Sequence, residues 1–245
     1  MKMRAFASRN FKEITRDKLT VFFGIGFPIL LILLMSAIQA HIPVDLFAIE
    51  RLAPGVAVFG LSFIALFSGL LISKDRTTSF MMRLFTSPLT PFDFIAGYIL
   101  PLFPISLLQS ILCFVVAFCL KMKLTAGVLL AIAVLIPTDI LFIGIGLLCG
   151  TFLNDKQVGG VCGALLTNVC GWMSGTWFDI ELVGGGFKKA AELLPFIHAV
   201  NAARAAVAGN YGDIFPDLYW VVGYAAVMIV LAVFLFSRKM KNGSE

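Results

Sequence analysis

Residues 52–73 read LAPGVAVFGLSFIALFSGLLIS, and no Asp, Glu, Lys or Arg interrupts this stretch. The hydrocarbon core of a bilayer is about 30 Å thick, and roughly 20 apolar residues in a helix cross it. Three charged residues, Lys74, Asp75 and Arg76, follow directly. An apolar stretch of this length that ends in a run of charges indicates a membrane-spanning helix that emerges into water.

The composition of the whole chain agrees with this interpretation. Hydrophobic residues make up 60% of its 245 residues and charged residues 13%, whereas an ordinary soluble domain is about 25% charged. Six apolar stretches are long enough to span a bilayer, at about 19–40, 52–73, 96–120, 124–150, 157–178 and 217–237. Their interiors contain a single acidic or basic residue, Asp139. We expect one all-α integral membrane domain over residues 1–245, with six transmembrane helices.

The basic residues predict the orientation of these helices. Cytoplasmic flanks of membrane proteins carry an excess of Lys and Arg, and thirteen of the 19 basic residues fall on one side of the expected topology. They are Lys2, Arg4, Arg9, Lys12, Arg16, Lys18, Lys74, Arg76, Arg83, Lys156, Arg238, Lys239 and Lys241. That side is therefore expected to be cytoplasmic, with both termini inside. Dispersed along membrane flanks, these charges suit anionic lipid head groups and argue against nucleic acid as a partner.

The first apolar stretch is expected to remain in the protein as a span. Its charged leader of 18 residues and its long apolar run both exceed what a cleaved signal peptide shows. The five cysteines all lie inside expected spans and form no C-x-x-C pair. We therefore expect neither a disulfide framework nor a metal site.

The N-terminal segment 1–18 has the pattern of an amphipathic helix. Met3, Phe6, Phe11 and Ile14 recur at helical spacing, and basic residues occupy other positions around the helix. This pattern predicts a helix that lies in the cytoplasmic interface of the bilayer. A flexible basic tail is the alternative.

A polar segment, 74–95, separates the second and third expected spans. Phe80, Met81, Leu84 and Phe85 put one apolar stripe on a short helix. Pro88 and then Pro91 prevent that helix from continuing. We expect a short cytoplasmic helix between stiff elbows, an element that can transmit force because a packed helix moves as a unit.

The outside segment 179–216 is too long for a structureless loop in a compact domain. The glycines at 184–186 make a flexible hinge, and helical patterns follow around 187–194 and 197–208, with Pro195 between them. Neither pattern is long enough to span a bilayer. We expect re-entrant or interfacial helices before the last span, with a bulky exposed loop as the alternative.

Polar residues inside the spans are candidates for a substrate site. Gln109, Asp139 and Asn168 lie near the middle of the third, fourth and fifth stretches. One interpretation is a midplane site for a cationic or hydrogen-bonding substrate. The other, which we favour, is that Asp139 hydrogen-bonds to Gln109, Asn168 or Thr138 and joins the helices. The glycines of the fourth and fifth stretches indicate close helix packing, inside the chain or between two copies.

The order of these features resembles the permease of type-2 ABC exporters, a group that includes drug, antibiotic, polysaccharide and lipid export systems. The resemblance covers nearly the whole chain. It rests on the basic N-terminal helix leading to Phe27 and Pro28, on RLFTSPL at 83–89, and on the outside segment from LPF at 194–196 to NAAR at 201–204. The stretch 83–89 is similar to the RLLVTPL stretch common between the second and third spans of that family.

The resemblance implies a permease that dimerises and sits on two ATP-binding subunits, which contact the helix between spans two and three. The residues implied for this ATPase coupling are Lys74, Asp75, Arg76, Met81, Arg83, Leu84, Phe85 and Pro88. In the outside segment the corresponding residues are Pro195, Asn201 and Arg204. Many relatives carry acidic residues and a glycine before the Arg-Leu pair, where this chain has TTSF at 77–80. Motor contacts at that point would have to use hydroxyl groups or Asp75.

No enzyme motif is found in the sequence. There is no G-x-x-x-x-G-K-[ST] loop for nucleotide phosphates, no G-x-S-x-G and no H-E-x-x-H. No cofactor is expected in this chain, and ATP with magnesium would bind a separate ATPase.

The expected function is therefore that of a permease in the inner membrane of a prokaryote, which exports a hydrophobic or amphipathic substrate (a drug, an antimicrobial peptide or a lipid) by alternating access. Its expected partners are an ABC ATP-binding subunit, a second permease copy (identical or related), membrane lipid and the substrate. The alternative is a non-ABC secondary transporter or assembly factor. One membrane aspartate and no visible repeat disfavour a proton-coupled transporter.

Overall fold

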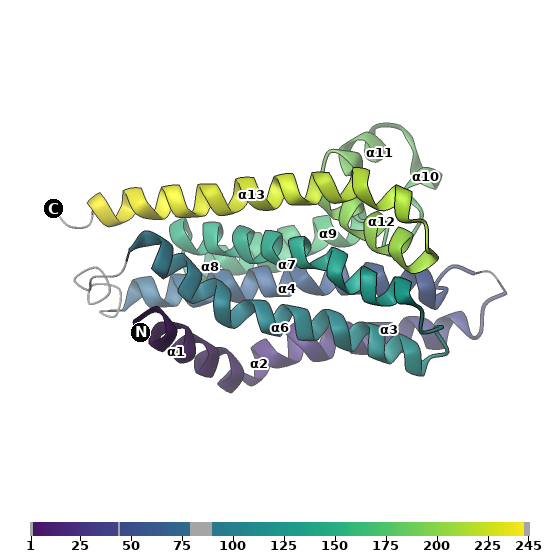
Figure 1. The fold of residues 1–245 in the computed structure, drawn as a ribbon, viewed down its shortest axis with the longest axis horizontal. Helices are drawn as coiled ribbons and strands as arrows, with labels where there is room; N and C mark the ends of the chain where they lie inside the picture. Colours follow the sequence, from purple (N-terminus) through teal and green to yellow (C-terminus); the bar gives the residue numbers. More distant parts are fainter. Residues whose placement is uncertain (1, 44, 79–89, 243–245) are drawn as a thin grey trace.

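A computed structural model describes residues 2–43, 45–78 and 90–242, and every regular element in these ranges is a helix (Figure 1). The first half contains α1 (Lys2–Arg16), α2 (Lys18–Val21), the π-helix η1 (Phe22–Gly26), α3 (Phe27–Gln39), α4 (Ile49–Thr77) and α6 (Pro91–Cys119). The second half contains α7 (Ala126–Phe152), α8 (Asp155–Val158), the π-helix η2 (Gly159–Leu166), α9 (Thr167–Met173), α10 (Ile180–Val183), α11 (Gly185–Glu192), α12 (Pro195–Ala208) and α13 (Tyr211–Asn242).

Five helical stretches in the described ranges are long and apolar enough to cross a membrane. They are Lys18–Gln39, Ile49–Thr77, Phe92–Cys119, Ala126–Phe152 and Tyr211–Arg238. At a rise of about 1.5 Å per residue, each can traverse a hydrocarbon core of about 30 Å. The expectation of an all-α membrane protein with several spans is confirmed.

The stretch expected as the fifth span, 157–178, has a different form. It is helical from Asp155 to Met173 as α8, η2 and α9, with a wide π-helical turn in its middle, and it is not among those five helices. The chain then leaves the helix at Ser174, in a tight turn where Gly175 has a φ of 70°. Glycine adopts this left-handed conformation without the steric cost that other residues have.

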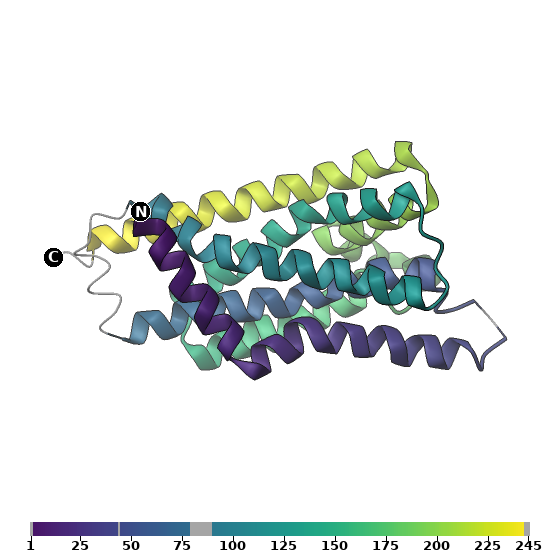
Figure 2. The ribbon, with the colours of Figure 1, turned by 60° about the horizontal axis from the view of Figure 1, so that its bottom comes forward.

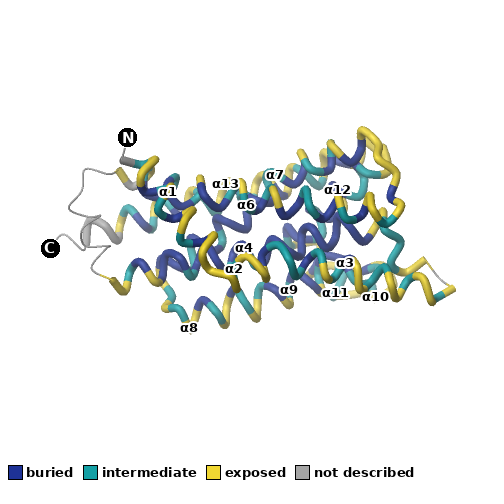
Figure 3. The backbone as a smooth tube through the Cα atoms, turned by 90° about the horizontal axis from the view of Figure 1, so that it is seen from below, coloured by how far each residue is buried: buried dark blue, intermediate teal, exposed yellow. Residues whose placement is uncertain are grey.

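Helix α4 forms the centre of the bundle. Exposed residues lie mainly along the outer faces of the bundle (Figure 3). In the most apolar 18-residue stretch of α4, 83% of the residues are buried, whereas the corresponding share in the first and last spans is 17%. Small residues let α7 pack closely on α4: a side chain at Gly146 would collide with Ser68 and with the Ala65 carbonyl group. Ser68 Oγ also donates to the Ile143 carbonyl group, 3.2 Å away. This part of the glycine pattern packs helices within one chain.

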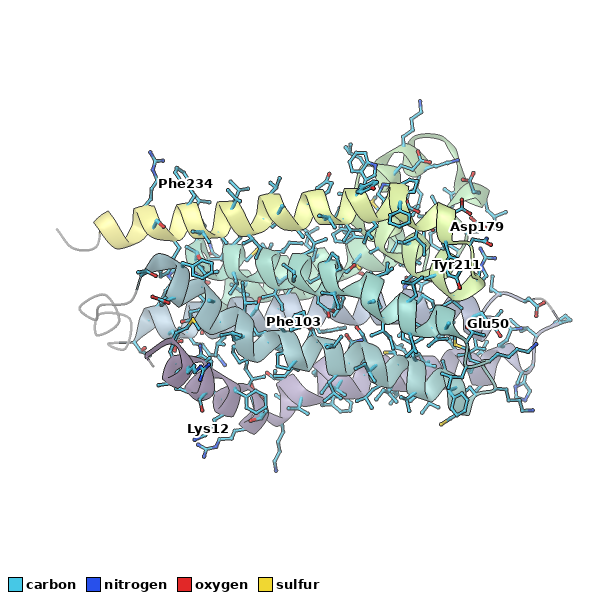
Figure 4. All side chains as sticks on the ribbon, in the orientation of Figure 1. Lys12, Glu50, Phe103, Asp179, Tyr211 and Phe234 are labelled. Carbon is cyan, nitrogen blue, oxygen red and sulfur yellow. The ribbon has the colours of Figure 1, made fainter. Side chains whose placement is uncertain are left out.

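The two ends of the bundle hold different parts of the chain (Figures 1 and 2). One end, called the terminal end below, carries α1, the last turns of α4, the start of α6 and the last turns of α13. The other end, called the distal end, carries α10, α11 and α12. In Figure 4, Lys12 lies at the terminal end, and Glu50 and Asp179 lie at the distal end.

The predicted N-terminal helix is present as α1, and it crosses the terminal end obliquely (Figure 2). Phe6 and Ile14 are buried inside the chain, whereas Phe11 is 44% exposed. Phe6 fits against α6 because Gly97 has no side chain there: a Cβ atom at Gly97 would collide with the Phe6 ring. Part of the apolar face that the pattern assigns to the bilayer is therefore used in packing on α6.

The distal segment has the helices that the sequence predicts, with shifted bounds. The patterns at 187–194 and 197–208 correspond to α11 and α12, and Pro195 is the first residue of α12 instead of a separator. Proline suits the first helical position because a backbone amide there would have no acceptor within the helix, so its absence costs nothing. Gly184 and Gly185 have φ values of 61° and 58°, so the glycine hinge is a left-handed turn between α10 and α11.

Candidate functional site

Three groups of polar residues are the candidates for function, at the terminal end, in the middle of the bundle and at the distal end. At the terminal end, Asp75 lies in the last turns of α4 with 3% of its side chain exposed. Its Oδ2 atom accepts a hydrogen bond from Arg9 Nη1 at 2.7 Å and one from Tyr98 Oη at 2.7 Å. The carboxylate therefore joins three helices, α1, α4 and α6.

Arg9 makes several further contacts on α1. Its guanidinium group pairs with Glu13 at 2.7 Å and donates to Asn10 Oδ1 at 2.8 Å. Burial by itself lowers the pKa of Arg9, but the hydrogen bond and charge of Asp75 outweigh it, and the pKa is raised above its ordinary value. Asn10 Nδ2 in turn donates to the Gly97 carbonyl group of α6, at 3.1 Å. The arginine stays charged and holds α1 on the bundle.

Aromatic rings surround this ion pair. The Phe6 ring lies edge-on to Tyr98, with centroids 5.0 Å apart, and stacks on Phe94 at 5.6 Å. Phe94 stacks on Phe236 of α13, with centroids 3.9 Å apart. Rings from α1, α6 and α13 thus pack together beside Asp75. Because they exclude water, they strengthen the electrostatic interactions of the carboxylate.

Arg76 connects the end of α4 to the end of α7. Its Nη1 atom donates to the carbonyl groups of Gly150, at 2.7 Å, and Leu153, at 3.3 Å. The last carbonyl groups of a helix have no partner inside that helix and carry partial negative charge, so a guanidinium group is favoured there. Ser73 extends the same connection to α8 through a hydrogen bond to Asp155. We call Phe6, Arg9, Asp75, Arg76 and Tyr98 the terminal anchor.

The predicted coupling residues divide into three sets in the structure. Lys74 is exposed. Asp75 and Arg76, expected in a loop, belong to the last turns of α4 and make the internal contacts just described. The remaining residues, Met81, Arg83, Leu84, Phe85 and Pro88, lie outside the described residues.

The start of α6 also differs from the predicted loop 74–95. The helix begins at Pro91, so Pro91 is its first residue instead of an elbow. The Thr90 amide donates to Asp93 Oδ2 at 3.2 Å, and the Asp93 amide donates to Thr90 Oγ1 at 3.1 Å. This reciprocal pair is a capping box, which stabilises the first turn of a helix. Helix α4 therefore ends at Thr77 and α6 begins at Pro91, which leaves segment 78–90 between them.

The midplane residues do not form the network that we favoured. Gln109 and Asp139 are fully buried, on α6 and α7, but Asn168 is exposed and donates to the Ala164 carbonyl group in its own helix. Gln109 Nε2 donates to the Ala57 carbonyl group of α4 at 3.3 Å. Within the described part of the chain, neither carboxylate oxygen of Asp139 has a hydrogen-bond partner, and neither has Thr138 Oγ1.

Asp139 is therefore a buried acidic group without the predicted helix-joining contacts. Ser110 Oγ and Gln109 Oε1, on the neighbouring helix α6, are likewise buried without a hydrogen-bond partner among the described residues. Burying polar atoms in this way costs free energy unless something else binds them.

At the distal end, a polar pocket of about 450 Å³ lies between the start of α4 and the helices α10 to α13. Two of the three residues predicted here, Asn201 and Arg204, line it, and Pro195 is buried at the start of α12. Arg204 Nη2 donates to the Gly175 carbonyl group at 2.8 Å, and Nε donates to the Arg51 carbonyl group at 3.1 Å. Arg204 thus holds α12 to the start of α4.

The sequence gave no reason to select His198, yet it contributes to the same pocket. Its Nδ1 atom is hydrogen-bonded to Asp217 of α13, and Nε2 lies 2.8 Å from the Glu192 carbonyl group. Burial by itself lowers the pKa of His198, but Asp217 and the Glu192 carbonyl group raise it above its ordinary value. His198, Asn201 and Arg204 are spaced three residues apart, and residues at this spacing lie on one face of a helix. This spacing is the signal that could have placed His198 on the pocket side of α12.

Within the part of the chain that the structure describes, no three His, Cys, Asp or Glu residues lie close enough together to hold a metal ion. No curated protein matches the chain. The family described as ABC-2 type transporter matches residues 1–207, a region that includes the terminal anchor, the midplane residues and most of the distal pocket. The chain therefore belongs to the ABC-2 type transporter family and is a multi-pass membrane permease domain of an ABC transporter.

Proposed function

We propose that this chain is the permease subunit of an ATP-driven exporter in the inner membrane of a prokaryote. It moves a hydrophobic or amphipathic substrate out of the cell by alternating access. Membership of the ABC-2 family supports ABC transport, and the strongly apolar composition suits a pathway for apolar molecules. The same membership leaves no support for a non-ABC transporter or an assembly factor.

The observation that carries this proposal is the anchoring of both ends of segment 78–90. On one side, Asp75 and Arg76 tie the end of α4 to α1, α6 and α7. On the other side, the capping box of Thr90 stabilises the start of α6. A push on the segment would move several spans together, because packed helices behave as rigid units.

The proposed topology has six spans with both termini in the cytoplasm. The helical stretch Asp155–Met173 supplies the span beyond the five long helices. The terminal end is then the cytoplasmic end, which agrees with thirteen of the 19 basic residues. The distal helices α10, α11 and α12 form the extracellular, re-entrant part.

The motor in this proposal is a separate ATP-binding subunit, which holds ATP and magnesium. It contacts segment 78–90, chiefly through Arg83 and the apolar residues Met81, Leu84 and Phe85, with Lys74 and Pro88 at the edges of the contact. Asp75 and Arg76 pass the movement on inside the bundle. Two permease copies, identical or related, form the complete exporter with two such subunits.

Copurification tests the coupling contact. The ATP-binding subunit should come down with the wild-type chain, and the double variant Arg83→Ala with Phe85→Ala should lose it. Lys12→Ala is the control, because Lys12 is an exposed basic residue at the same end. If the double variant keeps the subunit as well as the control does, the proposed contact is wrong.

A further inference from the structure

An apolar groove runs along the outer side of α13 near the distal end, with a volume of about 540 Å³. Tyr219, Trp220, Tyr224, Val227 and Met228 line it. A second apolar hollow, of about 310 Å³, lies between α7, α12, α13 and the η2–α9 stretch, and it shares Tyr224 and Met228 with the groove. Together the two spaces have a size typical of small-molecule sites.

Trp220 connects this apolar space to the polar distal pocket, since it lines both. Its ring stacks on His198, with centroids 5.2 Å apart and planes 3° from parallel. Tyr224 stacks on Trp220 in turn and donates its hydroxyl to the Leu193 carbonyl group at 2.7 Å. The polar distal pocket and the apolar groove are therefore adjacent, and the rings of Trp220 and Tyr224 lie where they meet.

The charges in the polar pocket are paired unevenly. Lys188 lies 2.6 Å from Glu181 and 3.7 Å from Glu192, Arg51 lies 3.4 Å from Asp179, and His198 is bonded to Asp217. The acidic groups in these contacts therefore already have basic partners.

Arg204 is the exception. Among the described residues it forms no ion pair with a carboxylate, and it donates hydrogen bonds to two backbone carbonyl groups. Burial and the nearby charge of Arg51 lower the pKa of Arg204 to about 10, while Asp179 opposes this. A cation in this position is stabilised by an anion that binds beside it.

We propose that the distal pocket and the α13 groove together bind one amphipathic molecule with an anionic head group. The head group, a phosphate or a carboxylate, pairs with Arg204, beside the charge of Arg51, and the apolar body lies along Trp220, Tyr224 and Met228. The molecule is the exported substrate, so the inference rests on the proposed export function and names the chemical class of its substrate.

Two other occupants fit the observations less well. A cationic head group would find its carboxylates already occupied by Lys188, Arg51 and His198. A second copy of the chain could cover the apolar groove, but it would leave the charge of Arg204 in the adjoining pocket without an anion. Both occupants are outcomes of the experiment below.

Fluorescence of Trp220 tests binding directly. The chain contains three tryptophans, so Trp172→Phe and Trp177→Phe leave Trp220 as the single reporter. The protein is placed in phosphatidylcholine nanodiscs and titrated with an alkyl phosphate that carries bromine on its tail, which quenches tryptophan by contact. A trimethylammonium amphiphile with the same brominated tail is the matched probe. We expect the phosphate to quench at about tenfold lower concentration, because hydrogen bonds to charged groups discriminate by this much.

Three variants assign the head group to its site. Arg204→Gln should weaken phosphate binding about tenfold, and Arg51→Gln should weaken it less. If Arg204→Gln fails to fold, Arg51→Gln still tests the inference. The Arg51 side chain is 57% exposed, so its replacement should not prevent folding. Lys189→Gln is the control, an exposed basic residue at the same end that does not line the pocket. Equal quenching by the two probes, or affinity unchanged in both arginine variants, would overturn the inference.

ATPase activity of the complete complex separates substrate from bilayer lipid. The alkyl phosphate should stimulate ATP hydrolysis by the wild type and by the control Lys189→Gln, and Arg204→Gln should remove the stimulation. Binding without stimulation would mean that a bilayer lipid occupies the site, and cross-linking of Val227→Cys between two copies with no quenching would mean that a second chain does. Both results would overturn the inference. If no ATP-binding subunit assembles, the proposed export function fails, while quenching still reports on the head group.

Discussion

At the terminal end, the carboxylate of Asp75 is buried and is bound by donors from two other helices. At the distal end, the half-buried guanidinium group of Arg204 is bound by backbone carbonyl groups, and its acidic neighbours belong to more exposed ion pairs. The first arrangement fixes α1, α4 and α6 as one block. The second leaves a polar pocket that opens toward an apolar groove.

The difference shows how one membrane domain can serve two purposes. A buried, fully paired carboxylate resists movement between helices, because separating it leaves charges without partners. Exposed pairs contribute little to stability and can exchange partners. The terminal end is therefore suited to transmitting force, and the distal end is suited to binding and release. The following predictions test this contrast, from the largest effect to the smallest.

Asp75→Ala should cause the largest loss. It leaves Arg9 and Tyr98 without their shared acceptor, which should lower the free energy of unfolding by about 3 kcal/mol. Chemical denaturation in detergent micelles measures the change. Glu181→Ala is the distal counterpart, and it should have no measurable effect, since 69% of the Glu181 side chain is exposed. Equal losses in the two variants would remove the contrast between the ends.

Gly97→Ala should detach α1 by a steric route. The added methyl group collides with Phe6, and overpacking of this kind costs about 2 kcal/mol. Gly212→Ala is the control, because a methyl group there would meet no atom within 4 Å. In a Phe6→Ala background the cost of Gly97→Ala should disappear, which a double-mutant cycle of unfolding free energies would detect. A cost that persists would mean that Phe6 is not the obstacle.

Asp139→Asn tests the region between the two ends. We expect the variant to fold, because the carboxylate oxygens have no described hydrogen-bond partner to lose. If Asp139 pairs with cationic substrates at the midplane, their export should fall about tenfold, the equivalent of about 1.4 kcal/mol, while export of neutral substrates is kept. The anionic substrate inferred for the distal pocket predicts no such selective loss. The measurement is transport by the reconstituted complex. If cationic and neutral substrates are affected equally, Asp139 has no direct part in substrate binding.

A pH titration tests the link between α12 and α13, with the smallest expected effect. Because the pKa of His198 is raised in the folded chain, its stabilisation is fully present below the ordinary value near 6.5 and is lost as pH rises through the raised value. The loss should be under about 1 kcal/mol. Melting temperatures of the wild type should fall over this range, whereas His198→Gln should remove that part of the pH dependence.

The second histidine provides the control for that titration. His41 is exposed and lies next to a backbone carbonyl group of α3, so His41→Gln should keep the wild-type pH dependence. A flat wild-type profile, or the same profile in His198→Gln, would show that the contact with Asp217 does not stabilise the distal end.

Patterns of apolar residues predicted most of the helices. A long charge-free stretch specifies a helical span, because any break in the helix would leave polar backbone groups unpaired in hydrocarbon. The stretch 157–178 is the instructive case: its composition predicts a span, but the π-helix η2 and the early exit at Ser174 depend on packing. Likewise, Lys74, Asp75 and Arg76 look like the start of a loop, because sequence alone does not reveal the partners that extend α4.

The candidate sites were predicted less completely. Asp139 was found from sequence because it is a charged residue inside an apolar span, and Arg204 because NAAR at 201–204 resembles the family pattern. The contact of Asp75 with Arg9 and Tyr98, and that of His198 with Asp217, join residues that are far apart or ordinary in type. No local pattern encodes such pairs, since they depend on which helices become neighbours.

The sequence by itself determined that this protein is an all-helical membrane protein, because the cost of exposing polar groups to hydrocarbon acts on every stretch of chain independently. The tertiary structure decided which charges are satisfied and which stay available. It buried Asp75 between three helices, left Asp139 without its predicted partners, and set Arg204 beside an apolar groove. The reason is physical: the free energy of a buried charge depends on the groups that surround it, and folding alone brings those groups together.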